Sequence, residues 1–148
     1  MSLVILTIIG AVIAAVVGTL WYSNATPMGK IHMRSMGFDT LTDAEKKKKM
    51  EEGKAMMGKM YTAQILLSLL TSFAVVFVVT ESLRNGLPLT LAIGFVLFNW
   101  LTFMVPVIGT RILWSSCDRS LAWKKFFSDI CENLVTVILV AIVAGIFA

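Results

Sequence analysis

At 148 residues the chain has the length of one ordinary domain, but 57% of its residues are hydrophobic, only 15% are charged, and its mean hydropathy is +0.84. A soluble domain has roughly half apolar and about a quarter charged residues, so this composition indicates that the bilayer takes the place of a buried core. The net charge of +4 does not indicate nucleic-acid binding, because that requires a basic face on a soluble fold.

Residues 3–22 form the first predicted membrane span. The stretch is nearly uncharged, and as a helix it reaches about 30 Å, the thickness of the hydrocarbon core. Trp21 and Tyr22 are its last residues, and aromatic rings of this kind favour the headgroup region of a membrane. A cleaved signal peptide is the competing interpretation, because Ser23-Asn24-Ala25 has small residues at a cleavage spacing. Against it, no basic segment precedes the stretch, and the apolar run exceeds the usual length of about 7–15 residues.

Small residues recur every four positions in this first span, at Gly10, Ala14 and Gly18. Such a strip lets another helix approach closely. The expected partner is either another span of the same chain or a span of a second subunit.

A charged helix leads into the second span. After a connector at residues 24–42, which contains the breakers Pro27, Gly29 and Gly37, the residues Thr42-Asp43-Ala44-Glu45 match a capping box. Four lysines follow: Lys46, Lys47, Lys48 and Lys49. We expect a solvated extension of the second span, which lies at 63–80. The alternative is a patch in which these lysines contact anionic lipid headgroups, worth about 1 kcal/mol per basic residue.

Two more apolar stretches complete the predicted bundle. A turn at residues 81–88 leads to the third span, at 89–108, where Pro106 predicts a kink. A polar connector at 111–125 leads to the fourth span, at 126–147. The predicted fold class is all-α: an integral membrane four-helix bundle in one domain, residues 1–148, with a charged cytoplasmic helical extension of the second span.

The basic residues indicate the orientation. The stretch from 24 to 60 contains eight Lys and Arg residues and that from 111 to 125 contains four, whereas the turn at 81–88 contains one. With four spans the two basic connectors lie on one side, and the positive-inside rule places that side in the cytoplasm. We expect a multi-pass protein of the cell (inner) membrane with both termini outside.

Polar side chains inside the spans predict a cluster. In the fourth span they repeat at helical spacing, and the second and third spans each carry a similar stripe. The predicted cluster comprises Gln64, Ser68, Asn99, Thr102, Asp129, Glu132, Asn133 and Thr136. Because lipid cannot satisfy such groups, they either bond the helices together or line a path for a small polar solute or ion. Asp129 and Glu132 lie near the basic connector, within reach of Arg111 or Lys125.

The sequence contains no recognised catalytic or metal-binding motif. It has no glycine-rich phosphate loop, no Gly-x-Ser-x-Gly and no His-Glu-x-x-His. The single histidine, His32, has no metal-site spacing to Cys117 or Cys131, and these two cysteines give no disulfide framework. We expect a protein that is not an enzyme and that has no cofactor or metal.

Several short motifs carry a resemblance: Gly18-Thr-Leu-Trp21-Tyr22-Ser23, Gly29-Lys30, Met36-Gly37, Asn99-Trp100-Leu-Thr-Phe103, and the stretch from Asp118-Arg119-Ser120 to Phe127. They resemble a family of small prokaryotic four-span membrane proteins that is catalogued only as a domain of unknown function. Many members have Pro at the position of Asn24 and an aromatic residue at that of Met28. The resemblance covers nearly the whole chain and implies the four-span architecture, but no activity, ligand or catalytic residue.

The strip of small residues and the lack of catalytic motifs favour a non-enzymatic protein that acts through helix association. It is expected to be a homo-oligomer or an accessory subunit of a membrane complex. The expected partners are the lipid bilayer and a second copy or another membrane protein, and not nucleic acid. The alternative function is a small-solute or ion pathway through the polar cluster in the inner leaflet.

Overall fold

All regular structure is helical in the computed structural model, which describes residues 1–114 and 118–148. The elements are α1 (Leu3–Trp21), α2 (Pro27–Ser35), α3 (Asp43–Arg84), α4 (Leu89–Asn99), the π-helical segment η1 (Trp100–Met104), α5 (Val105–Leu113) and α6 (Arg119–Phe147). In this part of the chain, the stretches long and apolar enough to cross a membrane are Leu3–Trp21, Gly58–Arg84, Leu89–Arg111 and Arg119–Phe147. The predicted all-α, four-span fold is confirmed. Cys117 lies outside the described residues.

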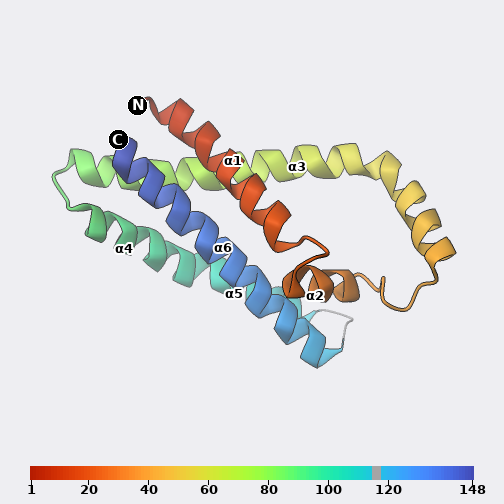
Figure 1. Cartoon of the computed structure of the whole chain (residues 1–148). Helices are drawn as coiled ribbons and strands as arrows, with labels where there is room; N and C mark the ends of the chain where they lie inside the picture. Colours follow the sequence, from red (N-terminus) through yellow and green to blue (C-terminus); the bar gives the residue numbers. More distant parts are fainter. Residues whose placement is uncertain (115–117) are drawn as a thin grey trace.

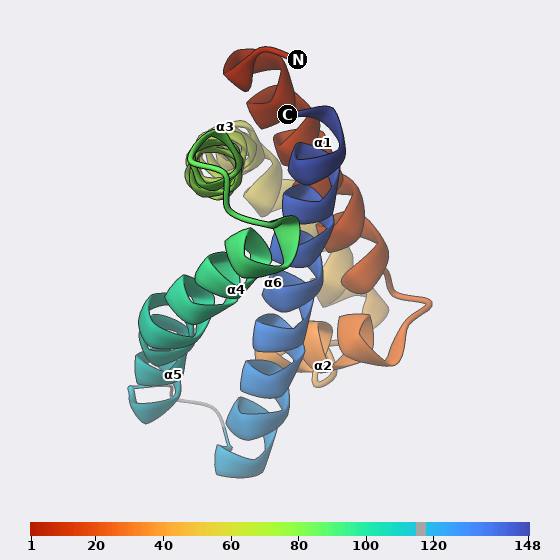
Figure 2. The same ribbon diagram turned by 90° about the vertical axis from the view of Figure 1, so that its left-hand side faces the viewer.

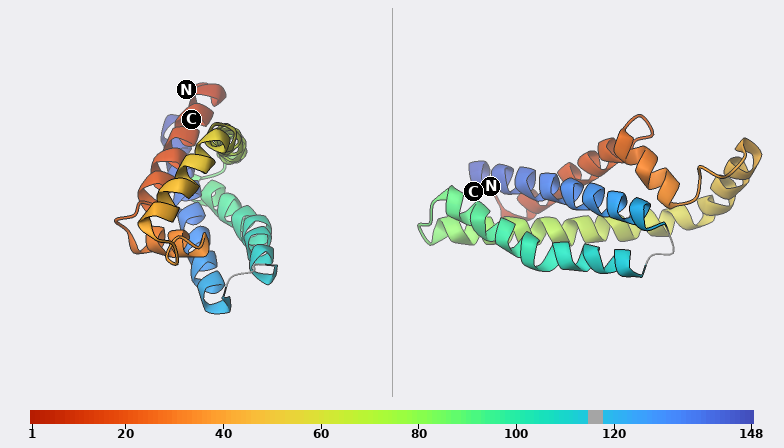
Figure 3. Two further views of the ribbon diagram at one scale, coloured as in Figure 1. Left: turned by 90° about the vertical axis from the view of Figure 1, so that its right-hand side faces the viewer. Right: turned by 90° about the horizontal axis from the view of Figure 1, so that it is seen from below.

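Helix α6 is the centre of the bundle. It contacts α1, α2, α3, α4 and α5, and Figure 2 shows it between α1 on one side and the α4–α5 helix on the other. The two termini lie side by side at one end, where the N-terminal amine of Met1 donates a hydrogen bond to the Phe147 carbonyl at 2.9 Å. The turn between α3 and α4 is at that end as well, whereas α2 and the start of α6 are at the other end (Figures 1 and 3). Both basic connectors therefore lie at the same end of the bundle.

Small residues let the helices pack closely near the end that holds the termini. The core there consists of Leu6, Val75, Val76, Val79, Val96, Val137, Val140, Ala141 and Ala144. Gly10 is buried where α1 crosses α3 and α6, and a Cβ atom at this position would lie 2.9 Å from the Ser72 Cβ and 3.0 Å from a Val140 methyl. The predicted strip on α1 thus packs, at Gly10, against helices of the same chain.

Residues 24–42 were expected to be a connector interrupted by helix breakers. Instead, Pro27–Ser35 within this stretch form the helix α2. The Thr26 hydroxyl caps the helix by accepting a hydrogen bond from the Gly29 N–H at 2.9 Å, and Pro27 occupies the first turn, where a missing N–H is harmless. Gly29 has to lack a side chain, because a Cβ atom there would lie 2.0 Å from the Ser23 carbonyl oxygen. Gly37, with φ of +72°, follows the helix end. Of the supposed breakers, Pro27 therefore begins the helix, Gly29 lies within it and Gly37 follows its end, and the helix contacts α6.

The predicted capping box is present at the start of α3. The Thr42 N–H donates to Glu45 Oε2 at 2.8 Å, and the Glu45 N–H donates to the Thr42 hydroxyl at 3.4 Å. From Asp43 the helix continues through 42 residues into the second span. Its first turns bend away from the remainder (Figure 1). Within the lysine run, the Lys49 ammonium donates a hydrogen bond to the Met36 carbonyl at 3.2 Å. The run is therefore solvated, as expected, and also contacts the end of α2.

The third span is irregular one turn before Pro106. Its α-helix gives way to the π-helical segment η1, in which the Val105 N–H donates to the carbonyl of Trp100, five residues back. Pro106 has no N–H, and its ring crowds the carbonyl four residues earlier, that of Thr102. A wider π turn relieves this crowding and restores hydrogen bonding. A kink was predicted at Pro106, and the structure has a π-helical segment upstream of the proline.

Candidate functional site

The structure divides the predicted polar cluster into two groups. Those that are buried or half-buried are Ser68, Asp129, Glu132, Asn133 and Thr136. Those that are exposed are Gln64, Asn99 and Thr102. The Asn99 amide donates to the Phe95 carbonyl at 2.8 Å, and the Thr102 hydroxyl donates to the Phe98 carbonyl at 2.8 Å, so both bond within their own helix. The stripe of the third span therefore does not join that of α6.

Of these residues, Asp129 lies where α1 ends against α6, and polar side chains from both helices meet there. The Trp21 indole N–H donates to the Ser128 hydroxyl at 3.1 Å, and the Tyr22 hydroxyl donates to Asp129 Oδ1 at 2.7 Å. Lys125, one turn earlier on α6, forms an ion pair with the same carboxylate oxygen. The α1–α6 cluster, as we define it, consists of Trp21, Tyr22, His32, Lys125, Ser128 and Asp129.

Asp129 is the centre of this cluster. Its side chain is 23% exposed and that of Lys125 is 22% exposed, so solvent screens the pair only in part. A carboxylate removed from water needs hydrogen-bond donors, and two of them converge on Oδ1. The Lys125 ammonium also lies 5.1 Å from the centroid of the Tyr22 ring, a cation–π contact. These three side chains hold the end of α1 on α6.

The only histidine of the chain packs on this cluster from α2. The ring centroids of His32 and Tyr22 are 4.8 Å apart, with their planes tilted by 45°. Burial and the nearby charge of Lys125 lower the pKa of His32 below its usual 6.5, while Asp129 acts in the opposite direction. Its Nδ1 atom is buried and finds no hydrogen-bond partner within the described residues. The fold therefore favours the neutral imidazole.

Further polar groups continue along α6 into the span. Glu132 Oε1 accepts a hydrogen bond from the Thr136 hydroxyl at 3.3 Å. Opposite it, a Cβ atom at Gly18 of α1 would lie 3.7 Å from the same oxygen. In the part of the chain that the structure describes, Asn133 Oδ1 and the indole N–H of Trp100 are buried without a hydrogen-bond partner. The described part of the chain thus leaves polar groups in the bundle without a partner.

Sequence reasoning identified Asp129 and a possible partner in Lys125, but it missed Tyr22 and His32. Tyr22 was interpreted only as an interfacial aromatic residue, and His32 lay in a stretch not expected to fold into a helix. A signal for Tyr22 was available in its position. It ends the first span on the side of the basic connectors, and on that same side the predicted fourth span starts at residue 126, one turn before Asp129. Nothing in the sequence signalled that α2 brings His32 to the same place.

The α1–α6 cluster offers a carboxylate, an ammonium, a phenol and a neutral imidazole at one end of the bundle. Its hydrogen bonds join α1 to α6, and its ring contact joins α2 to α1. Among the described residues, no three or more His, Cys, Asp and Glu side chains come together as metal ligands would. The arrangement is suited to tethering helices.

A family model described as "Protein of unknown function (DUF1761)" matches residues 5–145. The matched range contains the α1–α6 cluster and nearly all of the bundle. The comparison with curated proteins gives no match, and neither does the comparison with solved structures. The resemblance to a domain of unknown function is confirmed.

Proposed function

The chain belongs to this family of proteins of unknown function, and on that premise we propose that it is a non-enzymatic multi-pass membrane protein that acts through helix association. It associates either with further copies of itself or, as an accessory subunit, with another membrane protein. The observation that carries the proposal is the outward position of Asn99.

Asn99 lies at the middle of the 23-residue stretch Leu89–Arg111, on an exposed face. Its side chain has two N–H donors and a carbonyl acceptor, of which one N–H bonds the Phe95 carbonyl. No other bond to this amide is formed within the described residues. Lipid has no group that bonds an amide at this depth, so a facing helix is the favourable partner.

Two neighbouring features support this face of the third span as the contact surface. Thr102, also exposed, lies one turn further along. The segment η1 begins directly after Asn99, and π-helical segments frequently mark functional sites. A symmetric contact through this face pairs the two Asn99 amides.

The test replaces Asn99 by leucine. An interhelical polar bond in a membrane contributes about 0.6 kcal/mol on average and up to about 1.7, and a symmetric pair forms two of them. We therefore expect Asn99→Leu to weaken a dimer by about 1–3 kcal/mol, roughly 5- to 150-fold in dissociation constant. Single-molecule photobleaching in liposomes over a range of protein-to-lipid ratios measures this constant.

Gln64→Leu is the matched control. It makes the same amide-to-apolar change at an exposed position near the start of the stretch Gly58–Arg84, where headgroups and water satisfy the amide. We expect it to leave association unchanged. If the wild-type chain is monomeric in nanodiscs and no membrane protein co-purifies with it, the proposal is wrong.

We also propose that the end of the bundle with α2 and the start of α6 faces the cytoplasm. The stretches from 24 to 60 and from 111 to 125 contain twelve of the thirteen Lys and Arg residues, and both connectors lie at this end. Such a concentration is retained on the cytoplasmic side during insertion. Both termini are then outside the cell membrane. A reporter fused after Ala148 that is active only in the cytoplasm is expected to stay inactive, and its activity would contradict this orientation.

A small-solute or ion pathway is the second candidate function. It is favoured by Glu132, half-buried within a span, and by the buried Oδ1 atom of Asn133, which has no hydrogen-bond partner within the described residues. Replacing both residues by leucine is expected to reduce flux into proteoliposomes if the pathway exists. Unchanged flux after this double replacement would argue against it.

A further inference from the structure

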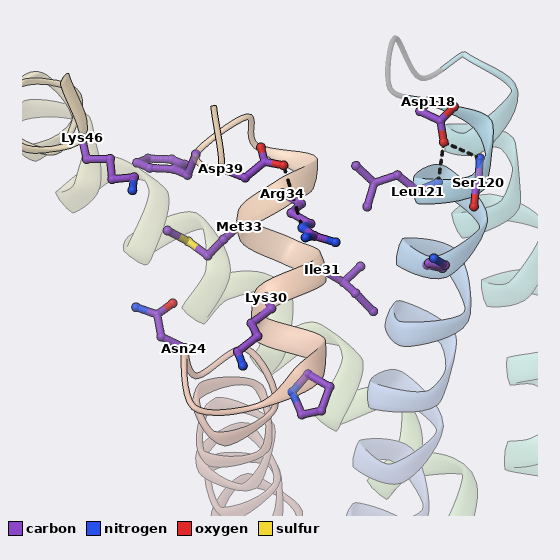
Figure 4. A pocket seen from close by; sticks show the side chains of 13 residues that line it. Asn24, Lys30, Ile31, Met33, Arg34, Asp39, Lys46, Asp118, Ser120 and Leu121 are labelled. Atoms are coloured by element: carbon purple, nitrogen blue, oxygen red, sulfur yellow. Dashed lines mark hydrogen bonds and ion pairs between the residues drawn. The ribbon is translucent and has the colours of Figure 1, made fainter. Parts of the chain in front are cut away.

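An open groove of about 1020 Å³ lies between α2, the start of α3 and the start of α6. Figure 4 shows the side chains that line it. Its charged members are Lys30, Arg34, Lys46, Lys124, Asp39 and Asp118. With four cationic and two acidic side chains, the groove has an excess of positive charge.

Two of these cations are free to bind a ligand. Arg34 lies 3.8 Å from the Asp39 carboxylate, and Lys46 lies 3.4 Å from that of Asp43. In contrast, Lys30 on α2 and Lys124 on α6 form no ion pair within the described residues, and both are exposed. The groove therefore presents two unpaired ammonium groups from different helices.

The acidic residue at the α6 side is already engaged. Asp118 Oδ2 accepts hydrogen bonds from the backbone N–H groups of Ser120 at 2.9 Å and Leu121 at 3.2 Å, so it caps the helix. Its charge is directed at the α6 N-terminus, where the helix dipole favours it. The repulsion that it exerts on an anion in the groove is correspondingly reduced.

Apolar side chains form the rest of the lining. Ile31 from α2 and Leu121 from α6 point toward the space between these two helices (Figure 4). A free inorganic anion gains nothing from such a surface, whereas the glycerol and the first methylenes of a lipid do. The combination of ammonium groups and apolar side chains is suited to an amphipathic anion.

The groove adjoins one end of the apolar spans, the level at which a membrane interface is expected. It is formed directly after the first span ends at Trp21, and the half-exposed aromatic ring of Trp123 is next to Lys124 at the start of α6. Aromatic residues of this kind concentrate at headgroup level. A groove at that level would be open to a lipid of the surrounding leaflet.

We propose that this groove binds the headgroup of an anionic phospholipid, with Lys30 and Lys124 supplying the unpaired positive charge that attracts it. The inference depends on the membrane location of the chain and not on its association through Asn99. This site is different from the lipid contact considered for the run Lys46 to Lys49. In that run Lys49 donates a hydrogen bond to the Met36 carbonyl and Lys48 lies 3.9 Å from the Glu52 carboxylate, so these two cations already have partners.

The test compares two double variants of the full chain purified in detergent. Lys30→Gln with Lys124→Gln removes the two free cations of the groove, and Lys47→Gln with Lys48→Gln removes the same charge outside it. Binding of phosphatidylglycerol is followed by native mass spectrometry and by the shift of melting temperature. Phosphatidylcholine and inorganic phosphate serve as the comparison ligands.

We expect the groove variant to bind phosphatidylglycerol roughly 10- to 30-fold more weakly, since each basic residue near the surface contributes several-fold to anionic-lipid binding. The control variant is expected to change affinity less than about threefold, through long-range charge alone. Equal weakening by the two variants, or equal binding of phosphatidylcholine, overturns the proposal. Displacement of the lipid by millimolar phosphate overturns it in favour of a free-anion site.

A third variant tests the proposal in the opposite direction. Asp39→Asn removes an acidic side chain from the groove and frees Arg34 from an ion pair that is largely exposed. Because exposed pairs contribute little to stability, this chain is expected to fold normally. It should bind phosphatidylglycerol several-fold more tightly than the wild type. Unchanged or weaker binding contradicts the proposal even if the groove variant fails to fold.

Discussion

Replacing Tyr22 by phenylalanine removes a single oxygen atom from the α1–α6 cluster. The lost interaction is the 2.7 Å hydrogen bond from the hydroxyl to Asp129 Oδ1. The ring keeps its contact with His32 and its position beside the Lys125 ammonium. The change therefore isolates one hydrogen bond to a charged group.

The expected magnitude follows from the partners of Asp129. A hydrogen bond to a charged group contributes about 1.5–3 kcal/mol. In the Tyr22→Phe variant the carboxylate still has the Lys125 ammonium as a partner, so it is not left buried and alone. The loss should therefore lie at the lower end of that range. We expect the free energy of unfolding to fall by about 1.5 kcal/mol.

The assay is reversible unfolding in mixed micelles, followed by tryptophan fluorescence, to which Trp21 of the cluster contributes. Tyr61→Phe is the matched control, because Tyr61 is the only other tyrosine and is 65% exposed. Its effect should stay within about 0.5 kcal/mol. A double-mutant cycle that combines Tyr22→Phe with Asp129→Asn should give a coupling energy of about 1 kcal/mol or more. Equal effects of the two tyrosine changes, with no coupling, would refute the role of this bond.

The close approach at Gly10 and the environment of His32 give two further predictions for the same assay. Gly10→Ala forces a methyl group against Ser72 and should destabilise the fold by about 1–3 kcal/mol. Gly94→Ala should not, because within the described residues nothing beyond its chain neighbours and its own helix backbone lies within 4 Å of the new Cβ. Burial and Lys125 lower the pKa of His32, so the fold favours the neutral ring. The contribution of the neutral ring to the free energy of unfolding should be fully present above pH 6.5 and should decline as the pH falls below this value. His32→Phe should abolish this decline. Equal effects of the two glycine changes, or a decline that persists without the imidazole, would contradict these predictions.

Local patterns in the sequence determined the framework of this protein. The bilayer has a set thickness, so the length of each apolar stretch is enough to identify a membrane-spanning helix. The capping box at Thr42 depends on residues three apart in the chain, which is why it is found where the sequence places it. The grouping of basic residues at one end follows from the number of spans between them.

The tertiary structure decided which polar groups meet. Helical spacing shows that Asp129 and Thr136 share a face of α6, but it says nothing of how far each helix is rotated toward its neighbours. That rotation follows from packing contacts such as Gly10 against Ser72, and it turns Asn99 outward while bringing Tyr22 to Asp129. It is set by the summed fit of many side chains from helices far apart in sequence.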